Sequence, residues 1–165
     1  MEITIFKDIK DTAQPFYRDV SKILERIQEG ASQDIVKSIR GEKDKEVRNK
    51  LKQSLPAICF SGKFTKRNDA SLVEHSGIIC LDFDNFPSEK EMLEKKEILT
   101  KDRYTYSVFI SPSGLGLKVL VKIPAESDTH KQFFNSLQHH YDSEYFDISC
   151  KNVSRVCYES YDPLI

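Results

Sequence analysis

Hydrophobic positions in the first third of the chain follow the helical period. Between residues 17 and 31 they recur at the i, i+3, i+4, i+7 spacing of one helix face: Val20, Ile23, Leu24 and Ile27. Gly30 follows as a stop signal, so the pattern predicts an amphipathic helix over this segment. Two shorter helices are expected around Gln33–Ile39 and Asp44–Ser54, before Pro56 closes the helical region.

Short strands alternate with helices in the rest of the chain. Runs of β-forming residues predict strands at "ITIF" near the start, and later at "AICF", "SGIICLDFD", "YTYSVFIS", "LGLKVLVKI" and "SRVCYES". Ser88 and Glu91 form a capping-box signature that opens a helix over residues 88–101. A second helix is expected over residues 127–141, with an apolar side made of Phe133, Phe134, Leu137 and Tyr141.

The order of these later elements predicts the fold class. A β-α-β-β-α-β order is typical of ferredoxin-like or RRM-like antiparallel sheets with flanking helices, an α+β arrangement within the broad α/β class. We expect a single domain over residues 1–165, in which a mostly helical N-terminal part (1–56) packs on a sheet core (57–165). The abrupt end at "SYDPLI" suggests the N-terminal piece of a longer protein.

The composition and charge of the chain argue against some classes of function. The formal net charge of −1 argues against duplex binding driven by overall charge. No apolar run approaches the roughly 20 residues that cross a bilayer. The N-terminus also lacks a secretion signal, so we expect a cytoplasmic protein without a membrane partner.

The four cysteines include no Cys-x-x-Cys pair, which favours buried free thiols over a disulfide framework. A site joining Cys150 and Cys157 to His139 or His140 is poorly supported by the spacing.

Although the net charge is close to zero, the sequence contains two local clusters of basic residues. The segment "KSIRGEKDKEVRNKLK" (37–52) mixes cations with acids and is most simply the solvated face of a helix. The segment "GKFTKR" (62–67) adds Lys63, Lys66 and Arg67 without an acid, directly after a strand and a turn. This second cluster is therefore the more informative of the two.

Asp82 and Asp84 end the strand "GIICLDFDN" with one phenylalanine between them. Alternation along a strand directs both carboxylates to the same face, with Cα atoms about 6.6 Å apart. Two charges at that distance repel by roughly 2.5 kcal/mol at an effective dielectric constant of about 20. A divalent cation such as Mg²⁺ or Mn²⁺ would reverse the sign of this interaction. A solvated loop that happens to begin with two acids is the alternative.

The segment "SPSGLGLKVLVKI" (111–123) reads as a hairpin rich in small residues. Gly114 and Gly116 supply either positive φ angles for an ordinary turn or room for an anion to approach the backbone. Lys118 would project from the face opposite Leu117 and Val119, and a lysine is a point charge suited to phosphate.

A third polar segment, "YFDISCKNVSRVCYESYDP" (145–163), contains Asp147, which alone is more simply a turn or helix cap than a ligand. Asn152 and Arg155 would share one side of a helical turn.

Together these segments resemble the archaeo-eukaryotic primase superfamily, the primase-polymerases. That family carries an acidic D-x-D after a strand, a Ser-x-His motif in a glycine-rich hairpin and a later aspartate on another strand. In this chain "LDFDN", "SPSGLGLKVLV" and "FDISCKNVSR" stand in that order. The segment 55–85, "LPAICFSGKFTKRNDASLVEHSGIICLDFDN", is similar to the VirE-type N-terminal domains of bacterial mobile elements, where the domain often precedes a helicase-like module.

The resemblance implies a nucleotidyltransferase that makes or extends primers on single-stranded DNA from nucleoside triphosphates, with a helicase-like domain in the same longer chain or in trans. The implied catalytic residues, which would hold two Mg²⁺ or Mn²⁺ ions, are Asp82, Asp84 and Asp147. The implied nucleotide-binding residues are Ser111, Ser113, Gly114, Gly116, Arg155 and Lys118, the last at the position of the family's histidine. The implied nucleic-acid contacts are Lys63, Lys66, Arg67 and Asn152.

Two other functions fit parts of the sequence. A primase-like module altered at Lys118 would bind single-stranded nucleic acid or nucleotide without polymerising. A phosphatase of the haloacid dehalogenase type also begins with a strand and D-x-D. It would need a small hydroxylated residue soon after the acids, where Asn85, Phe86 and Pro87 stand, and a doubly wound parallel sheet, against which the hairpin at Ser113 argues.

Overall fold

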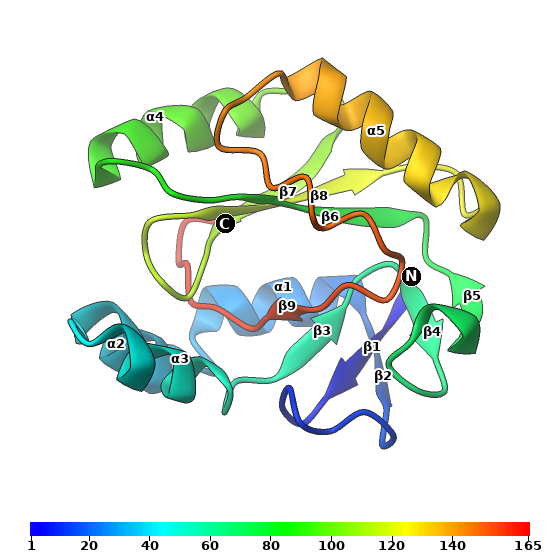
Figure 1. The fold of residues 1–165 in the computed structure, drawn as a ribbon, viewed down its shortest axis with the longest axis horizontal. Helices are drawn as coiled ribbons and strands as arrows, with labels where there is room; N and C mark the ends of the chain where they lie inside the picture. Colours follow the sequence, from blue (N-terminus) through cyan, green and yellow to red (C-terminus); the bar gives the residue numbers. More distant parts are fainter.

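A three-stranded antiparallel sheet forms the middle layer of the molecule. The computed structural model describes all residues from Met1 to Ile165, and it places β8 (Leu117–Lys122) between β6 (Ile78–Phe83) and β7 (Thr105–Ile110). Two helices, α4 (Glu89–Thr100) and α5 (His130–Tyr141), cover the upper face of this sheet in Figure 1. The N-terminal elements and the last strand lie below it, so the sheet is covered on both faces.

A second sheet lies in the lower layer, with strand order β2-β1-β3-β9. Its strands come from both ends of the chain: β1 (Glu2–Phe6), β2 (Phe16–Asp19), β3 (Ala57–Cys59) and β9 (Cys157–Tyr158). The helix α1 (Val20–Glu29) lies beside this sheet, and α2 (Gln33–Gly41) and α3 (Lys45–Lys52) extend to the lower left of Figure 1. None of the five helices combines the length and the apolarity needed to cross a bilayer.

A small hairpin completes the fold at the right of Figure 1, made of β4 (Gly62–Phe64) and β5 (Leu72–His75). Two 3₁₀ turns, Asp69–Ser71 and Ser127–Thr129, precede β5 and α5. All strand pairs in the structure are antiparallel. This excludes the doubly wound parallel sheet that a phosphatase of the haloacid dehalogenase type would need.

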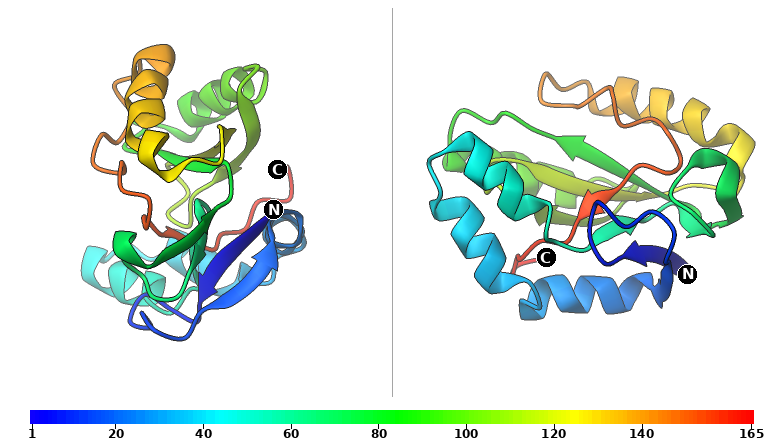
Figure 2. Two further views of the ribbon diagram at one scale, coloured as in Figure 1. Left: turned by 90° about the vertical axis from the view of Figure 1, so that its right-hand side faces the viewer. Right: turned by 60° about the horizontal axis from the view of Figure 1, so that its bottom comes forward.

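Alternation along β6 separates two apolar cores. Ile79, Leu81 and Phe83 are buried against α4 and α5, while Ile78 is buried on the opposite face against α1 and β3. A buried side chain of this size contributes about 1.5–3 kcal/mol. The left view of Figure 2 shows the central sheet between the two layers. The second core joins the N-terminal part to the sheet, because it contains side chains from β1, α1 and all three central strands.

The structure confirms most of the predicted elements, including the three short N-terminal helices and the strands of the central sheet. The first helix begins later than predicted, at Val20, because Phe16–Asp19 pairs with β1 as an additional strand. Asp19 then caps the helix by accepting a hydrogen bond from the Ser21 N–H at 2.9 Å. The N-terminal part, expected to be mostly helical, thus also contributes two strands.

The predicted last strand does not join the central sheet. Only Cys157–Tyr158 is a strand, and it pairs with β3 in the lower layer. The expected ferredoxin-like arrangement is therefore wrong in its fourth strand, because another segment occupies the position beside β6: Phe146 forms an isolated antiparallel bridge with Phe83. The "SGKFTKR" segment, for which no strand was predicted, contains the strand β4. All four cysteines are free and three are buried, as predicted.

Two buried histidines connect β5 to the start of α5. His75 Nδ1 accepts a hydrogen bond from the Gly77 N–H at 3.0 Å, so its proton lies on Nε2, which donates to His130 Nδ1 at 3.0 Å. Burial lowers the pKa of His75, and burial together with His75 lowers the pKa of His130 to about 4. The charges of Asp69 and Lys131 also act on the pKa of His130, and they do so in opposite directions. The folded state therefore requires both rings to be neutral.

This pair predicts a loss of stability in acid. Because the folded pKa lies below the ordinary value of about 6.5, the stabilisation is complete above that pH and is lost as the pH falls toward 4, by roughly 3 kcal/mol for His130. Urea unfolding at several pH values measures the slope of the free energy of unfolding against pH. His130→Gln is expected to flatten it, while His139→Gln, at an exposed position of the same helix, is expected to leave it unchanged. An equal slope in all three proteins would contradict this assignment.

Candidate metal site

The end of β6 places Asp82 between two neighbouring chain segments. Lys118 on β8 is its direct cross-strand partner on one side. On the other side, Asp147 N–H donates to the Asp82 carbonyl at 2.9 Å, and Asp84 N–H donates to the Tyr145 carbonyl at 2.8 Å. Directly opposed residues share a face of a sheet, so Lys118 and Asp147 flank Asp82 on the face that looks away from α4 and α5.

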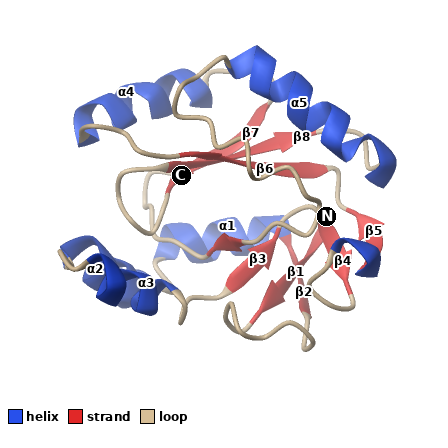
Figure 3. Cartoon of the chain, in the orientation of Figure 1, coloured by secondary structure: helices blue, strands red, loops and turns tan.

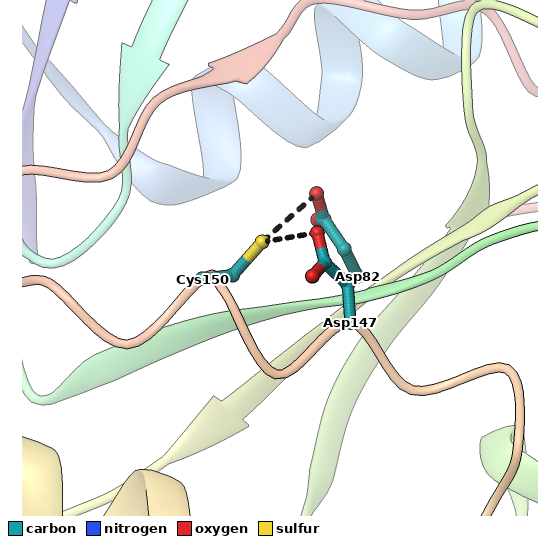
Figure 4. Close-up of side chains that lie close together, drawn as sticks. All are labelled: Asp82, Asp147 and Cys150. Carbon is teal, nitrogen blue, oxygen red and sulfur yellow. Dashed lines mark hydrogen bonds between the residues drawn. The ribbon is translucent and has the colours of Figure 1, made fainter.

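A cysteine joins the two aspartates (Figure 4). Cys150 Sγ lies 3.1 Å from Asp147 Oδ2 and 3.5 Å from Asp82 Oδ2. One ligand atom from each residue lies within 4.8 Å of the others. We call Asp82, Asp147 and Cys150 the carboxylate–thiol cluster. Asp82 and Cys150 are buried and Asp147 is half-buried, so the cluster lies at the boundary between the interior and solvent.

Lys118 forms a buried ion pair with the cluster. Its Nζ lies 2.5 Å from Asp82 Oδ2, and each of the two side chains is only 11% exposed. Burial by itself would lower the pKa of Lys118, but the charges of Asp82 and Asp84 outweigh it and hold the pKa well above its usual range. The ammonium group is therefore a permanent internal cation at the centre of the site. As predicted, it projects from the face opposite Leu117 and Val119.

Asp84 lies beside the cluster without belonging to it. A Cβ atom at Gly116 would overlap Asp84 Oδ1 and would lie 3.0 Å from both the Phe83 carbonyl and Ser111 Oγ. The glycine is required here for space and not, as one sequence interpretation had it, for a positive φ. Burial raises the pKa of Asp84, and the charges of Asp82 and Asp147 add to this against Lys118 and Lys52. A bound cation would relieve this accumulation of negative charge.

Asp147 is the more solvated carboxylate of the cluster. Burial would raise its pKa, but the Cys150 thiol, the Ser149 N–H and the charge of Arg155 outweigh it, so the pKa is lowered. Arg155 Nη2 lies 3.8 Å from Asp147 Oδ2 and is 41% exposed. Burial raises the pKa of Cys150 and the charge of Asp82 adds to it, so the free site holds a protonated thiol.

The predicted nucleotide-binding residues of the hairpin have different surroundings. Ser111 and Ser113 share a hydrogen bond of 2.9 Å between their hydroxyls. Gly114 has φ +86, the positive value expected for its turn, and packs against the Arg40 side chain. Arg40 Nη2 donates to the Ser111 carbonyl at 3.2 Å and to the Tyr161 carbonyl at 2.8 Å, which fixes the hairpin to α2.

The residues predicted to contact nucleic acid lie on the β4–β5 side of the molecule. Lys63 is paired with Glu2 at 2.5 Å and with Glu74 at 3.2 Å, so it is not a free cation. Lys66 is exposed, and Arg67 has a buried Nη1 without a hydrogen-bond partner.

Asn152 Nδ2 donates to Ser154 Oγ at 3.2 Å in an irregular turn, while Arg155 contacts Asp147. A single turn joins Asn152 to Arg155, because the Arg155 N–H donates to the Asn152 carbonyl at 3.0 Å, and no helix continues from it.

A basic cleft adjoins Asp84 and was not recognised from the sequence. It has a volume of about 570 Å³ and is lined by Lys45, Arg48, Asn49 and Lys52 of α3 and by Asp84, Asn85, Phe86, Ser113 and Leu115. We call it the α3 cleft. The signal was present, because the four α3 residues recur at the i, i+3, i+4, i+7 spacing, but the surrounding acids made them resemble a solvated helix face. Cys150 had been considered only with Cys157 and His139 or His140, and its place beside Asp82 and Asp147 was missed, since a single thiol has no recognisable spacing.

Comparison with known families assigns the chain to one family. Residues 50–165 match the family model described as BT4734-like, N-terminal domain, and the chain therefore belongs to that family. The match begins within α3 and includes Asp82, Asp84, Asp147 and Cys150. No curated protein and no solved structure matches the chain.

The donor set of the cluster fits a divalent cation. Two carboxylates supply the hard oxygen ligands that Mg²⁺ and Mn²⁺ take, and a thiolate adds a softer ligand that favours Zn²⁺. Cys150 Sγ lies within donating distance of both carboxylates but carries one hydrogen, which a cation bound by the thiolate would replace. The preference between these metals would therefore depend on whether Cys150 takes part.

Replacing Lys118 tests the buried ion pair. Lys118→Met leaves Asp82 buried without its partner, which is expected to lower the free energy of unfolding by about 3–5 kcal/mol. Adding Asp82→Asn is expected to restore a large part of this loss, which denaturant unfolding of both variants measures. Lys122→Met is the control on the same strand: this lysine is exposed and lies 4.4 Å from the centroid of the Tyr106 ring, so its loss should cost no more than about 1 kcal/mol. A double variant no more stable than Lys118→Met would contradict the account.

Replacing Cys150 tests its part in metal binding. If the thiol is a ligand, Cys150→Ser is expected to weaken Zn²⁺ binding at least about tenfold while changing Mg²⁺ binding much less. Isothermal titration calorimetry with each metal measures both affinities. Cys59→Ser, a buried thiol in a separate core, is the control. Equal weakening of Zn²⁺ binding in both variants would exclude Cys150 as a ligand.

Proposed function

We propose that this chain is a metal-dependent nucleotidyltransferase domain of the primase-polymerase type, which extends or starts a primer on single-stranded DNA in the replication of a mobile element. The observation that carries the proposal is the convergence of Asp147, from a distant segment of the sequence, on Asp82 and Asp84 at one strand end. Their order along the chain and the hairpin between them are the features that the sequence shares with that superfamily.

In this proposal each group of the chain has a defined task. Asp82, Asp147 and Cys150 hold a divalent cation, and Asp84 contributes its carboxylate from the adjoining cleft. Such a cation would supply charge neutralisation for the triphosphate and lower the pKa of an attacking hydroxyl. Lys118 neutralises Asp82, and Gly116 provides the space that keeps Asp84 against the hairpin. Positioning and fixed charge would carry most of the rate.

Lys118 favours a second candidate function. A lysine held as a cation by a buried ion pair neutralises charge but does not exchange protons at neutral pH. If the reaction needs a proton carrier at this position, the domain binds nucleotide or single-stranded nucleic acid without joining nucleotides. The same acids and the same cleft serve both functions, so only an activity measurement separates them.

The catalytic proposal is tested by nucleotide incorporation. Wild-type protein with Mn²⁺ or Mg²⁺ is expected to extend a labelled primer on a single-stranded template, and Asp84→Asn is expected to lower the rate at least about a hundredfold, because a bound metal supplies several kcal/mol. The substitution removes a charge but keeps the shape. Glu126→Gln, at an exposed position, is the control.

The absence of incorporation by wild-type protein on any primed or unprimed template would overturn the catalytic proposal. In that case a thermal-shift titration separates the remaining functions. Stabilisation by Mn²⁺ with a nucleoside triphosphate, lost in Asp84→Asn, indicates nucleotide binding, and stabilisation by an oligonucleotide alone indicates a nucleic-acid-binding module.

A further inference from the structure

The α3 cleft has one cationic wall and one acidic residue opposite it. Lys45, Arg48 and Lys52 project from one face of α3 into the cleft, while Leu51 of the same helix packs toward the core formed by Val36, Ile39 and Leu55. Asp84 lines the other side, near the carboxylate–thiol cluster. The packing of Leu51 fixes the rotation of the helix, so the cationic face is held toward the end of β6.

The three cations of this wall have no ion-pair partner in the structure, whereas Lys63 and Lys96 elsewhere are neutralised by acids. Burial lowers the pKa of Lys52, and the charges of Arg48 and Lys118 lower it further, against Asp84 alone. Three like charges gathered around a partly enclosed space repel one another. An anion in the cleft would remove this repulsion and replace lost hydration.

We propose that the α3 cleft binds the phosphate chain of a metal-bound nucleoside triphosphate. This inference rests on the proposed function and adds the residues that would hold the phosphates: Lys45, Arg48 and Lys52. The volume of about 570 Å³ lies within the ordinary range for small-molecule sites. The charge pattern also matches a compact metal complex, because the cation belongs near Asp84 and the phosphate oxygens near α3. A nucleic-acid backbone carries no cation of its own and would meet Asp84 as a repulsive charge.

The hairpin completes the cleft on the side of β8. Ser113 lines it, and its hydroxyl is held by Ser111. Arg40 lies behind Gly114 and donates to backbone carbonyls, so its charge is already engaged in fixing the hairpin. The cationic residues available to a ligand are therefore those of α3, and they lie upstream of the motifs on which the sequence resemblance rests.

Binding of inorganic triphosphate tests the inference without requiring catalysis. Isothermal titration calorimetry is done with inorganic triphosphate and with a deoxynucleoside triphosphate, each with Mn²⁺. We expect Arg48→Gln and Lys52→Gln to weaken both ligands about tenfold or more, since each removes a charge-assisted hydrogen bond. Lys50→Gln is the matched control, because it removes the same charge from the same helix outside the cleft, and its affinity should equal that of wild type. Melting temperatures of all variants check that they fold.

The outcomes separate this inference from the proposed function. Triphosphate binding that depends on Arg48 and Lys52, without nucleotide incorporation, supports the cleft and overturns only the catalytic proposal. Incorporation by wild type, with triphosphate affinity unchanged in both α3 variants, overturns the cleft alone. A labelled single-stranded oligonucleotide is the third probe, measured by fluorescence anisotropy. If the α3 variants weaken oligonucleotide binding and leave triphosphate binding unchanged, the cleft binds nucleic-acid backbone and the inference is wrong.

Discussion

The buried ion pair between Lys118 and Asp82 is the interaction on which the rest of this structure depends. The two side chains lie opposite each other on neighbouring strands, with 2.5 Å between Nζ and Oδ2. Taking either charge out of water alone is unfavourable by several kcal/mol, and the pair is tolerated because each group neutralises the other. Apolar side chains pack on both faces of the same two strands, including Leu81 and Leu120. The ion pair thus sits where the cores end and the polar site begins.

This constraint also sets the charge of the surroundings. Because Lys118 neutralises Asp82, the remaining acids are Asp147, with Arg155 at 3.8 Å, and Asp84, whose pKa is raised mainly by burial. On the far side of Asp84 the cations of α3 have no partners. A ligand that neutralises both the acids and the cations of α3 must contain a cation and several anionic groups. A metal-bound polyphosphate has this composition, which supports one continuous site over two unrelated ones.

Patterns within short stretches of the sequence predicted most helices and strands correctly, whereas the pairing of strands from distant segments was harder to predict. The alternation in β6 and the Ser88 cap are properties of short stretches and were read correctly, with the Glu91 N–H donating to Ser88 Oγ at 3.2 Å. The pairing of β9 with β3 could not be predicted from the sequence. A strand of two residues is too short to show an alternating pattern, and either sheet has an edge strand with which it could pair. In the site, the resemblance selected Asp147, but the contribution of Cys150 depends on a bridge at Phe146 that no local signal encodes.

The most direct test of the account is anomalous diffraction from a crystal soaked with Mn²⁺ and a non-hydrolysable nucleoside triphosphate. The account predicts a manganese peak among Asp82, Asp147 and Cys150, with phosphate density extending past Asp84 toward Arg48 and Lys52. Full nucleotide occupancy without a manganese peak at these carboxylates would contradict it. So would nucleotide bound on another surface while Lys118 and Asp82 remain unchanged.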